Sequence, residues 1–258
     1  MSETRKSDPQ AASQWFTRPK SNQQARLRLF CFPYAGGNAH AFSKWPQQLP
    51  PGVEVLAAQL PGRASRIREP PHTGLHALVE ELGRAVRPYL DVPFAFFGHS
   101  MGAMIGFELA RLLRREGVGA PTHLFVSGRR APQIPNTDAL TYNLPDAELI
   151  EQLRRLNGTP PAVLEHPELM QLMLPLLRAD FEVVETYRYV DEPPLDCPIS
   201  AFGGLQDPEV TREQLEAWRA QTTSGFVRRM FDGDHFFLHR AEPLLLRTIA
   251  RELHEQGL

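Results

Sequence analysis

The sequence predicts an α/β protein with a mostly parallel, doubly wound sheet and a helical insertion. Two observations predict this fold class. Short apolar runs alternate with amphipathic helical patterns along most of the 258 residues, which is the order found in a parallel sheet covered by helices. Between about residues 135 and 192 the strand signals stop and only helical patterns remain, so this stretch is expected to form an insertion above the sheet.

Each expected strand is a short apolar run that ends at Gly, Pro or other turn residues. The first run stops at Pro33 and the second at Pro61 and Gly62. The run at 94–97 is continuously apolar, as in a strand buried on both faces. The expected strands cover residues 27–32, 53–59, 94–97, 123–127, 199–202 and 226–231.

Helices are expected where apolar residues recur at spacings of three and four. Thr211 and Gln214 have the spacing of a capping box, and Pro175 should kink or split the long pattern that contains it. The expected helices cover residues 75–90, 103–115, 146–156, 167–189, 211–220 and 242–254. Residues 1–25 lack periodicity and are expected to form a disordered tail, so the folded domain would span 26–258 with its insertion at about 135–192.

Composition and charge exclude several functional classes. The formal net charge is −2, which gives no basic footprint for nucleic acid. Cys31 and Cys197 lie in apolar runs without disulfide or metal-site spacing, and we expect neither a metal nor a cofactor. No apolar run reaches the roughly 18 residues of a membrane span, and the polar N-terminus is no secretory signal. A cytoplasmic protein is therefore expected.

The strongest chemical signal is a G-x-S-x-G motif, in which Gly98 and Gly102 flank Ser100. The motif follows a buried strand pattern and opens a helix, which is the setting of a nucleophile elbow in the α/β-hydrolase fold. The glycines are needed because side chains there would clash with the adjoining strand and helix. Ser100 is therefore the candidate nucleophile, and an ordinary strand-to-helix turn is the alternative.

A serine nucleophile needs a base and an orienting acid, which follow it in the order Ser, Asp, His in this fold. His235 follows the end of a strand in a loop rich in turn residues, where a base at the carboxyl edge of a sheet belongs. Asp207 follows the strand before it, after a Gly-Gly turn. Asp232 and Asp234 compete for the role of the acid, but they are too close to His235 in sequence to approach its ring easily.

Acyl transfer also needs N–H donors for the developing oxyanion. The backbone N–H of Met101, directly after the nucleophile, is one candidate. The second is expected from the loop after the first strand, at residues 32–37, and Ala35 is the candidate there.

Several further motifs occur together with these in one order along the chain. The chain resembles the type II thioesterases that accompany polyketide synthases and nonribosomal peptide synthetases, from about Leu27 to the C-terminus. The resemblance rests on Phe-Pro-Tyr-Ala-Gly-Gly (32–37), Gln-Leu-Pro-Gly-Arg (59–63), Phe-Gly-His-Ser-Met-Gly (97–102), Leu-Arg-Arg-Leu-Asn-Gly-Thr-Pro (153–160), Leu-Pro-Leu-Leu-Arg-Ala-Asp-Phe (174–181), Gly-Gly-Leu-Gln-Asp-Pro (203–208) and Gly-Asp-His-Phe-Phe (233–237).

The resemblance implies a function, a partner and a lid. The function is hydrolysis of aberrant or stalled acyl groups from the phosphopantetheine arm of acyl or peptidyl carrier proteins. The oligomeric state that the resemblance implies is a monomer. A generic carboxylesterase or lipase, and a medium-chain fatty acyl thioesterase, share the same triad and are the alternatives. A non-catalytic binding protein of the same fold is a further alternative, although such a protein has no need of Asp207.

The resemblance also makes the helical insertion a lid over an acyl chamber. The long lid helix is more apolar than one buried face requires, so some of its residues are expected to line that chamber, although packing onto the sheet would explain them as well. The expected lining residues are Met170, Met173, Leu174 and Leu177. Arg63, Arg66 and Arg68 follow a strand end and are candidates to steer acidic carrier proteins, with a solvated polar loop as the alternative.

Overall fold

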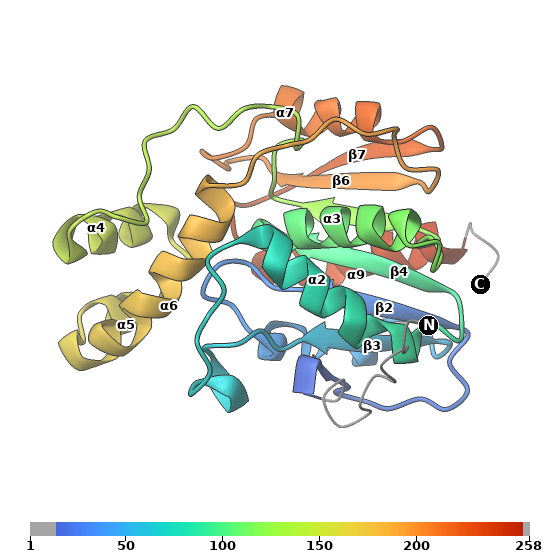
Figure 1. The fold of residues 1–258 in the computed structure, drawn as a ribbon, viewed down its shortest axis with the longest axis horizontal. Helices are drawn as coiled ribbons and strands as arrows, with labels where there is room; N and C mark the ends of the chain where they lie inside the picture. Colours follow the sequence, from blue (N-terminus) through green and yellow to red (C-terminus); the bar gives the residue numbers. More distant parts are fainter. Residues whose placement is uncertain (1–13, 255–258) are drawn as a thin grey trace, which may run out of the picture.

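The computed structural model describes residues 14–254, which form one mixed sheet covered by helices on both faces (Figure 1). The sheet has seven strands in the order β1-β3-β2-β4-β5-β6-β7. All neighbouring strands are parallel except β1, which runs antiparallel to β3. The strands are β1 (Phe16–Thr17), β2 (Leu27–Phe32), β3 (Val53–Ala58), β4 (Phe94–His99), β5 (Leu124–Ser127), β6 (Ile199–Gly204) and β7 (Phe226–Phe231).

The helices divide into those that cover the sheet and those of the lid. Longer covering helices lie on opposite faces, with α2 and α3 on one face and α9 on the other (Figure 1). The covering helices are α2 (Leu75–Val86), α3 (Met101–Arg115), α7 (Arg212–Glu216), α8 (Phe237–Arg240) and α9 (Glu242–His254). The lid helices are α4 (Asp146–Leu156), α5 (Pro161–Leu164) and α6 (Pro167–Glu185).

The two faces of the sheet explain why the central strands are mostly apolar. Phe30 and Phe32 of β2 point into the core under α2 and α3, whereas Leu29 and Cys31 point into the core under α9. Successive side chains of a strand point to opposite faces, and both faces of this sheet are covered. A central strand therefore needs apolar side chains on both of its faces.

The lid projects from one end of the sheet and has a small core of its own (Figure 1). Helix α6 continues through Pro175 from Pro167 to Glu185, so the expected split at this proline does not occur. The capping box expected at Thr211 and Gln214 is present at the start of α7.

The expected disordered tail at residues 1–25 is wrong in part. Residues 1–13 lie outside the described residues, but residues 15–17 are part of the fold. Trp15 and Phe16 are buried, and Phe16 pairs with Ala58 as strand β1 adds to the edge of the sheet. A strand of two residues is too short to produce the alternation by which strands are recognised in a sequence. The folded domain therefore begins before residue 26.

In the part of the chain that the structure describes, no helix has both the length and the apolar character needed to cross a membrane. Residues 14–254 also contain no group of three or more His, Cys, Asp or Glu side chains arranged to bind a metal ion.

Candidate active site

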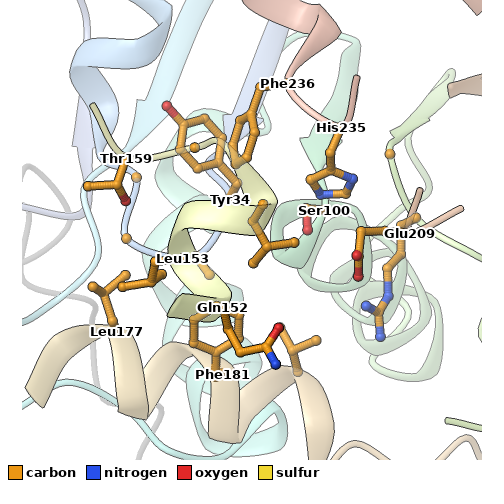
Figure 2. Close-up of a pocket in the computed structure, with 18 of the residues that line it drawn as sticks. Tyr34, Ser100, Gln152, Leu153, Thr159, Leu177, Phe181, Glu209, His235 and Phe236 are labelled. Carbon is orange, nitrogen blue, oxygen red and sulfur yellow. The ribbon is translucent and has the colours of Figure 1, made fainter. Parts of the chain in front are cut away.

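The loops at the carboxyl edge of the sheet enclose a cavity of about 1030 Å³ beneath the lid. Ser100 and His235 both line it, and Figure 2 shows the imidazole of His235 beside Ser100. Parallel strands end at the same edge, so loops that are far apart in sequence contribute side chains to one site.

Ser100 occupies a strained turn between β4 and α3. Its φ is 53° and its ψ is −112°, a conformation that L-residues rarely adopt. The turn is tightly packed, because a Cβ on Gly98 would lie 2.0 Å from the carbonyl oxygen of Gly102 and a Cβ on Gly102 would lie 2.0 Å from that of Phe32. The two motif glycines therefore allow the close approach of backbones that holds Ser100 in this turn.

His235 and Asp207 form a hydrogen-bonded pair next to this turn. Nδ1 of His235 lies 2.9 Å from Oδ2 of Asp207, whose side chain has no exposed surface. The other carboxylate oxygen of Asp207 accepts the N–H of Glu209 at 2.8 Å. With Nδ1–H donating to the carboxylate, Nε2 of His235 is left unprotonated and able to accept a proton.

His99, a residue not singled out by the sequence, lies directly behind this pair. Its ring centroid is 5.2 Å from that of His235, its Nδ1 lies 2.9 Å from the hydroxyl of Ser127, and its Nε2 has no hydrogen-bond partner among the described residues. Burial holds the pKa of His99 well below its usual value, and the proximity of His235 lowers this pKa further. His99 therefore stays neutral and places no second positive charge beside His235.

The two expected oxyanion donors have N–H groups available. Met101 is the first residue of α3, so its N–H has no acceptor within the helix. Ala35 lines the cavity, and within residues 14–254 its N–H has no acceptor either. The next two N–H groups of the same loop are occupied, because Gly36 donates to Asp180 at 2.7 Å and Gly37 donates to the carbonyl oxygen of Tyr34 at 2.8 Å.

The structure divides the four expected chamber residues of α6 into two pairs. Met173 and Leu177 line the cavity, whereas Met170 and Leu174 do not, and for those two the expectation is wrong. Met170 and Leu174 pack into the lid core against α4 and α5. Each pair is four residues apart and so shares one face of the helix, and only one of those two faces borders the cavity.

The expectation of a carrier-steering arginine patch is wrong for two of its three residues. Arg63 and Arg66 are buried: Arg63 pairs with Asp180 at 2.7 Å, and Arg66 pairs with Glu69 and lies over the ring of Trp15. Both guanidinium groups therefore bind within the fold. Arg68 is exposed.

The lid also contacts the loop that carries His235. The side-chain amide of Asn157 donates to Asp234 at 2.9 Å, and a Cβ on Gly158 would overlap the ring of Phe236. Phe236 in turn packs edge-on against Tyr34, with ring centroids 5.0 Å apart, and both rings line the cavity (Figure 2). Asn157 and Gly158 belong to the 153–160 motif, but nothing in the sequence places them against a segment 77 residues away.

A parallel sheet with a strained serine after a central strand, and with a His–Asp pair at the same edge, defines the α/β-hydrolase class. The thioesterase domain family matches residues 27–254, and the chain belongs to this family. It is a hydrolase that acts on thioesters.

Two similar proteins are named after gramicidins. Gramicidin S biosynthesis protein GrsT of Aneurinibacillus migulanus is 48% identical over 241 residues, which cover 93% of this chain and 94% of that protein. Linear gramicidin dehydrogenase LgrE of Brevibacillus parabrevis is 46% identical over 244 residues, which cover 93% of each chain.

Solved structures of thioesterases superpose closely on this chain. RedJ, a thioesterase of the prodiginine pathway in Streptomyces coelicolor, has a TM-score of 0.84 and 43% identity, with 88% of this chain and 91% of RedJ covered. The type II thioesterase BorB of the borrelidin cluster has a TM-score of 0.86 and 37% identity, and the match covers 96% of this chain and 99% of BorB.

Proposed function

We propose that this thioesterase removes aberrant or stalled acyl groups from the phosphopantetheine arm of acyl or peptidyl carrier proteins, with Ser100, His235 and Asp207 as its catalytic triad. The main support for the triad is the hydrogen bond of 2.9 Å between His235 and Asp207, because His235 and Ser100 line the same cavity. The gramicidin and borrelidin proteins named above support the carrier-bound substrate.

The geometry supports an acyl-enzyme mechanism. Oγ of Ser100 attacks the thioester carbonyl and Nε2 of His235 accepts its proton, while Asp207 stabilises the imidazolium. The N–H groups of Met101 and Ala35 bind the oxyanion of the tetrahedral intermediate. Collapse breaks the C–S bond, and the departing thiolate, whose thiol has a pKa of about 8.5, takes up the proton from His235. Water then repeats the sequence on the acyl-Ser100 ester and releases the acid.

The triad is tested by labelling with a fluorophosphonate. Intact-protein mass spectrometry should show one adduct on the native protein and none on Ser100→Ala, with heat-unfolded native protein as the unlabelled control. Turnover of Ser100→Ala should fall to the residual of roughly 10³–10⁴-fold over water that remains without a triad member. Labelling of Ser100→Ala at the native rate would refute the assignment.

The substrate class is tested by presenting the same acyl groups on a carrier protein, on coenzyme A and as oxoesters. Faster hydrolysis of the carrier-bound thioesters is expected. Preference for oxoesters would identify a general esterase, and preference for medium-chain groups would favour a role like that of the rat medium-chain S-acyl fatty acid synthase thioesterase, which is 35% identical over 231 residues.

A further inference from the structure

A buried ion pair joins the lid helix α6 to the loop after β3. The side chains of Arg63, just after β3, and Asp180, on α6, are 4% and 3% exposed, and two hydrogen bonds of 2.7 Å connect them. Removing two charges from water costs about as much as their attraction returns, so such a pair is weak evidence of a contribution to stability.

Nε of Arg63 also donates to the carbonyl oxygen of Pro61 at 3.2 Å, and two further hydrogen bonds of this pair go to two consecutive glycines. Oδ2 of Asp180 accepts the N–H of Gly36 at 2.7 Å, and the Arg63 guanidinium donates to the carbonyl oxygen of Gly37 at 3.0 Å. Leu177, one turn before Asp180 on α6, packs against the same loop, because a Cβ on Gly36 would lie 2.7 Å from its side chain. Helix α6 thus holds this loop through a carboxylate and an apolar side chain.

Residues 34–37 form the turn that orients the N–H of Ala35. The N–H of Gly37 donates to the carbonyl oxygen of Tyr34 at 2.8 Å and closes the turn. That carbonyl and the N–H of Ala35 belong to one planar peptide unit and point in opposite directions. Fixing the carbonyl of Tyr34 therefore fixes the direction of the Ala35 N–H, and Asp180 and Arg63 fix the two glycines that complete the turn.

We propose that Asp180 and Arg63 are positioning residues for the oxyanion donor Ala35, supplied by the lid helix and the loop after β3. This inference rests on the oxyanion role given to Ala35 in the proposed function. Leu177 and Phe181 of the same helix line the cavity (Figure 2), so the wall of the acyl chamber and the support of the oxyanion donor are one element. Misplacing α6 then lowers kcat as well as acyl affinity.

The test is Asp180→Asn, which keeps the shape of the side chain but turns an amide N–H₂ toward either Gly36 or Arg63. Loss of one oxyanion donor costs about 10²–10³ in kcat, and a misdirected donor should cost about 10- to 100-fold, with KM nearly unchanged. A trifluoromethyl ketone analogue of the substrate forms a tetrahedral adduct with an oxyanion, so its Ki should rise by the factor by which kcat/KM falls. A thioether analogue, which forms no oxyanion, should keep its Kd.

Glu252→Gln is the matched control. Glu252 is likewise buried, at 4% side-chain exposure, and pairs with Arg229 at 2.9 Å. It also bonds Ser200 near the start of β6, at the opposite edge of the sheet from the cavity. This variant should lower Tm and leave kcat and both inhibitor constants unchanged.

Three outcomes separate the possibilities. If Asp180→Asn weakens the binding of the ketone and of the thioether by the same factor, the positioning role is refuted. It is also refuted if Asp180→Asn lowers kcat no more than Glu252→Gln does. If Asp180→Asn does not fold, Arg63→Lys replaces it with the same readouts, because one ammonium cannot reproduce the paired guanidinium bonds. If the native protein prefers oxoesters, the proposed substrate fails while the positioning role is still measured on those oxoesters.

Discussion

The carboxylate of Asp207 accepts the Nδ1–H of His235 at 2.9 Å, although the two residues are 28 positions apart. Asp234, directly before His235, bonds the lid residue Asn157 instead and makes no bond to the imidazole. The acid that is distant in sequence, and not the neighbouring one, is therefore placed to hold the ring.

We expect Asp207→Asn to leave the fold intact and lower kcat by about 10⁴, because the amide favours the wrong tautomer of His235. Asp234→Asn and Asp232→Asn should be mild, and of these two only Asp234→Asn should loosen the contact with Asn157. Steady-state hydrolysis of one thioester by the three variants measures this. A larger loss in Asp234→Asn than in Asp207→Asn would mean that another residue is the acid.

Gly102→Ala should destabilise the protein by about 3 kcal/mol or more, because its Cβ would lie 2.0 Å from the carbonyl oxygen of Phe32, where only backbone movement can make room. Gly106→Ala, one turn later in α3, is the matched control. Its Cβ would lie 3.5 Å from its nearest neighbours, and alanine raises helix stability by up to about 1 kcal/mol. The midpoint of urea denaturation should therefore fall for Gly102→Ala and rise for Gly106→Ala.

Leu177→Trp should shorten the acyl chamber, because Leu177 lines the cavity. Each methylene of the acyl chain contributes about 1–3 kcal/mol to discrimination, so the loss of kcat/KM should grow with chain length. Leu174→Ala is the control, because Leu174 packs only in the lid core. It should lower Tm and leave the chain-length profile as it is. An unchanged profile in Leu177→Trp would show that this residue serves packing alone.

Of the three arginines that the sequence offers for carrier docking, Arg68 is exposed, and Arg68→Glu tests that role. The KM for a carrier-bound thioester should rise by up to about fivefold, the effect of an exposed charge pair of about 1 kcal/mol, while the KM for a coenzyme A thioester should not change. Arg66→Glu should instead lower the free energy of unfolding, because it places a carboxylate at a buried position next to Glu69. Equal effects of Arg68→Glu on both substrates would remove the docking role.

Stability should fall as the pH falls from about 6.5 to 4. Burial lowers the pKa of His123 to about 4 from 6.5, so below 6.5 the unfolded chain binds a proton that the folded protein does not. The loss approaches about 1.4 kcal/mol per pH unit for this residue, and His99, whose pKa is lowered in the same direction, adds to it. Denaturation at several pH values gives the slope of the free energy of unfolding against pH, and we expect a shallower slope for His123→Gln. His76→Gln, at an exposed position, should keep the native slope. An unchanged slope in His123→Gln would contradict the prediction.

The sequence by itself determined the features that depend on neighbouring residues. The parallel sheet followed from alternating apolar runs, and the serine turn followed from Gly98 and Gly102 at fixed spacing around Ser100. Asp207 and His235 were recognisable because each directly follows a strand, and strands of a parallel sheet end at one edge. The bond between them is observed, and their catalytic roles remain the proposal tested above.

Only the tertiary structure decided which side chains are exposed, paired or turned to the cavity. Arg63 was expected at the surface, yet its partner Asp180 lies 117 positions further along the chain. Met173 and Leu177 line the cavity while Met170 and Leu174 do not, although all four are equally apolar in the sequence. Burial and charge pairing are relations between distant segments, and the energy that orients each of these side chains comes from contacts that exist only once the lid has packed onto the sheet.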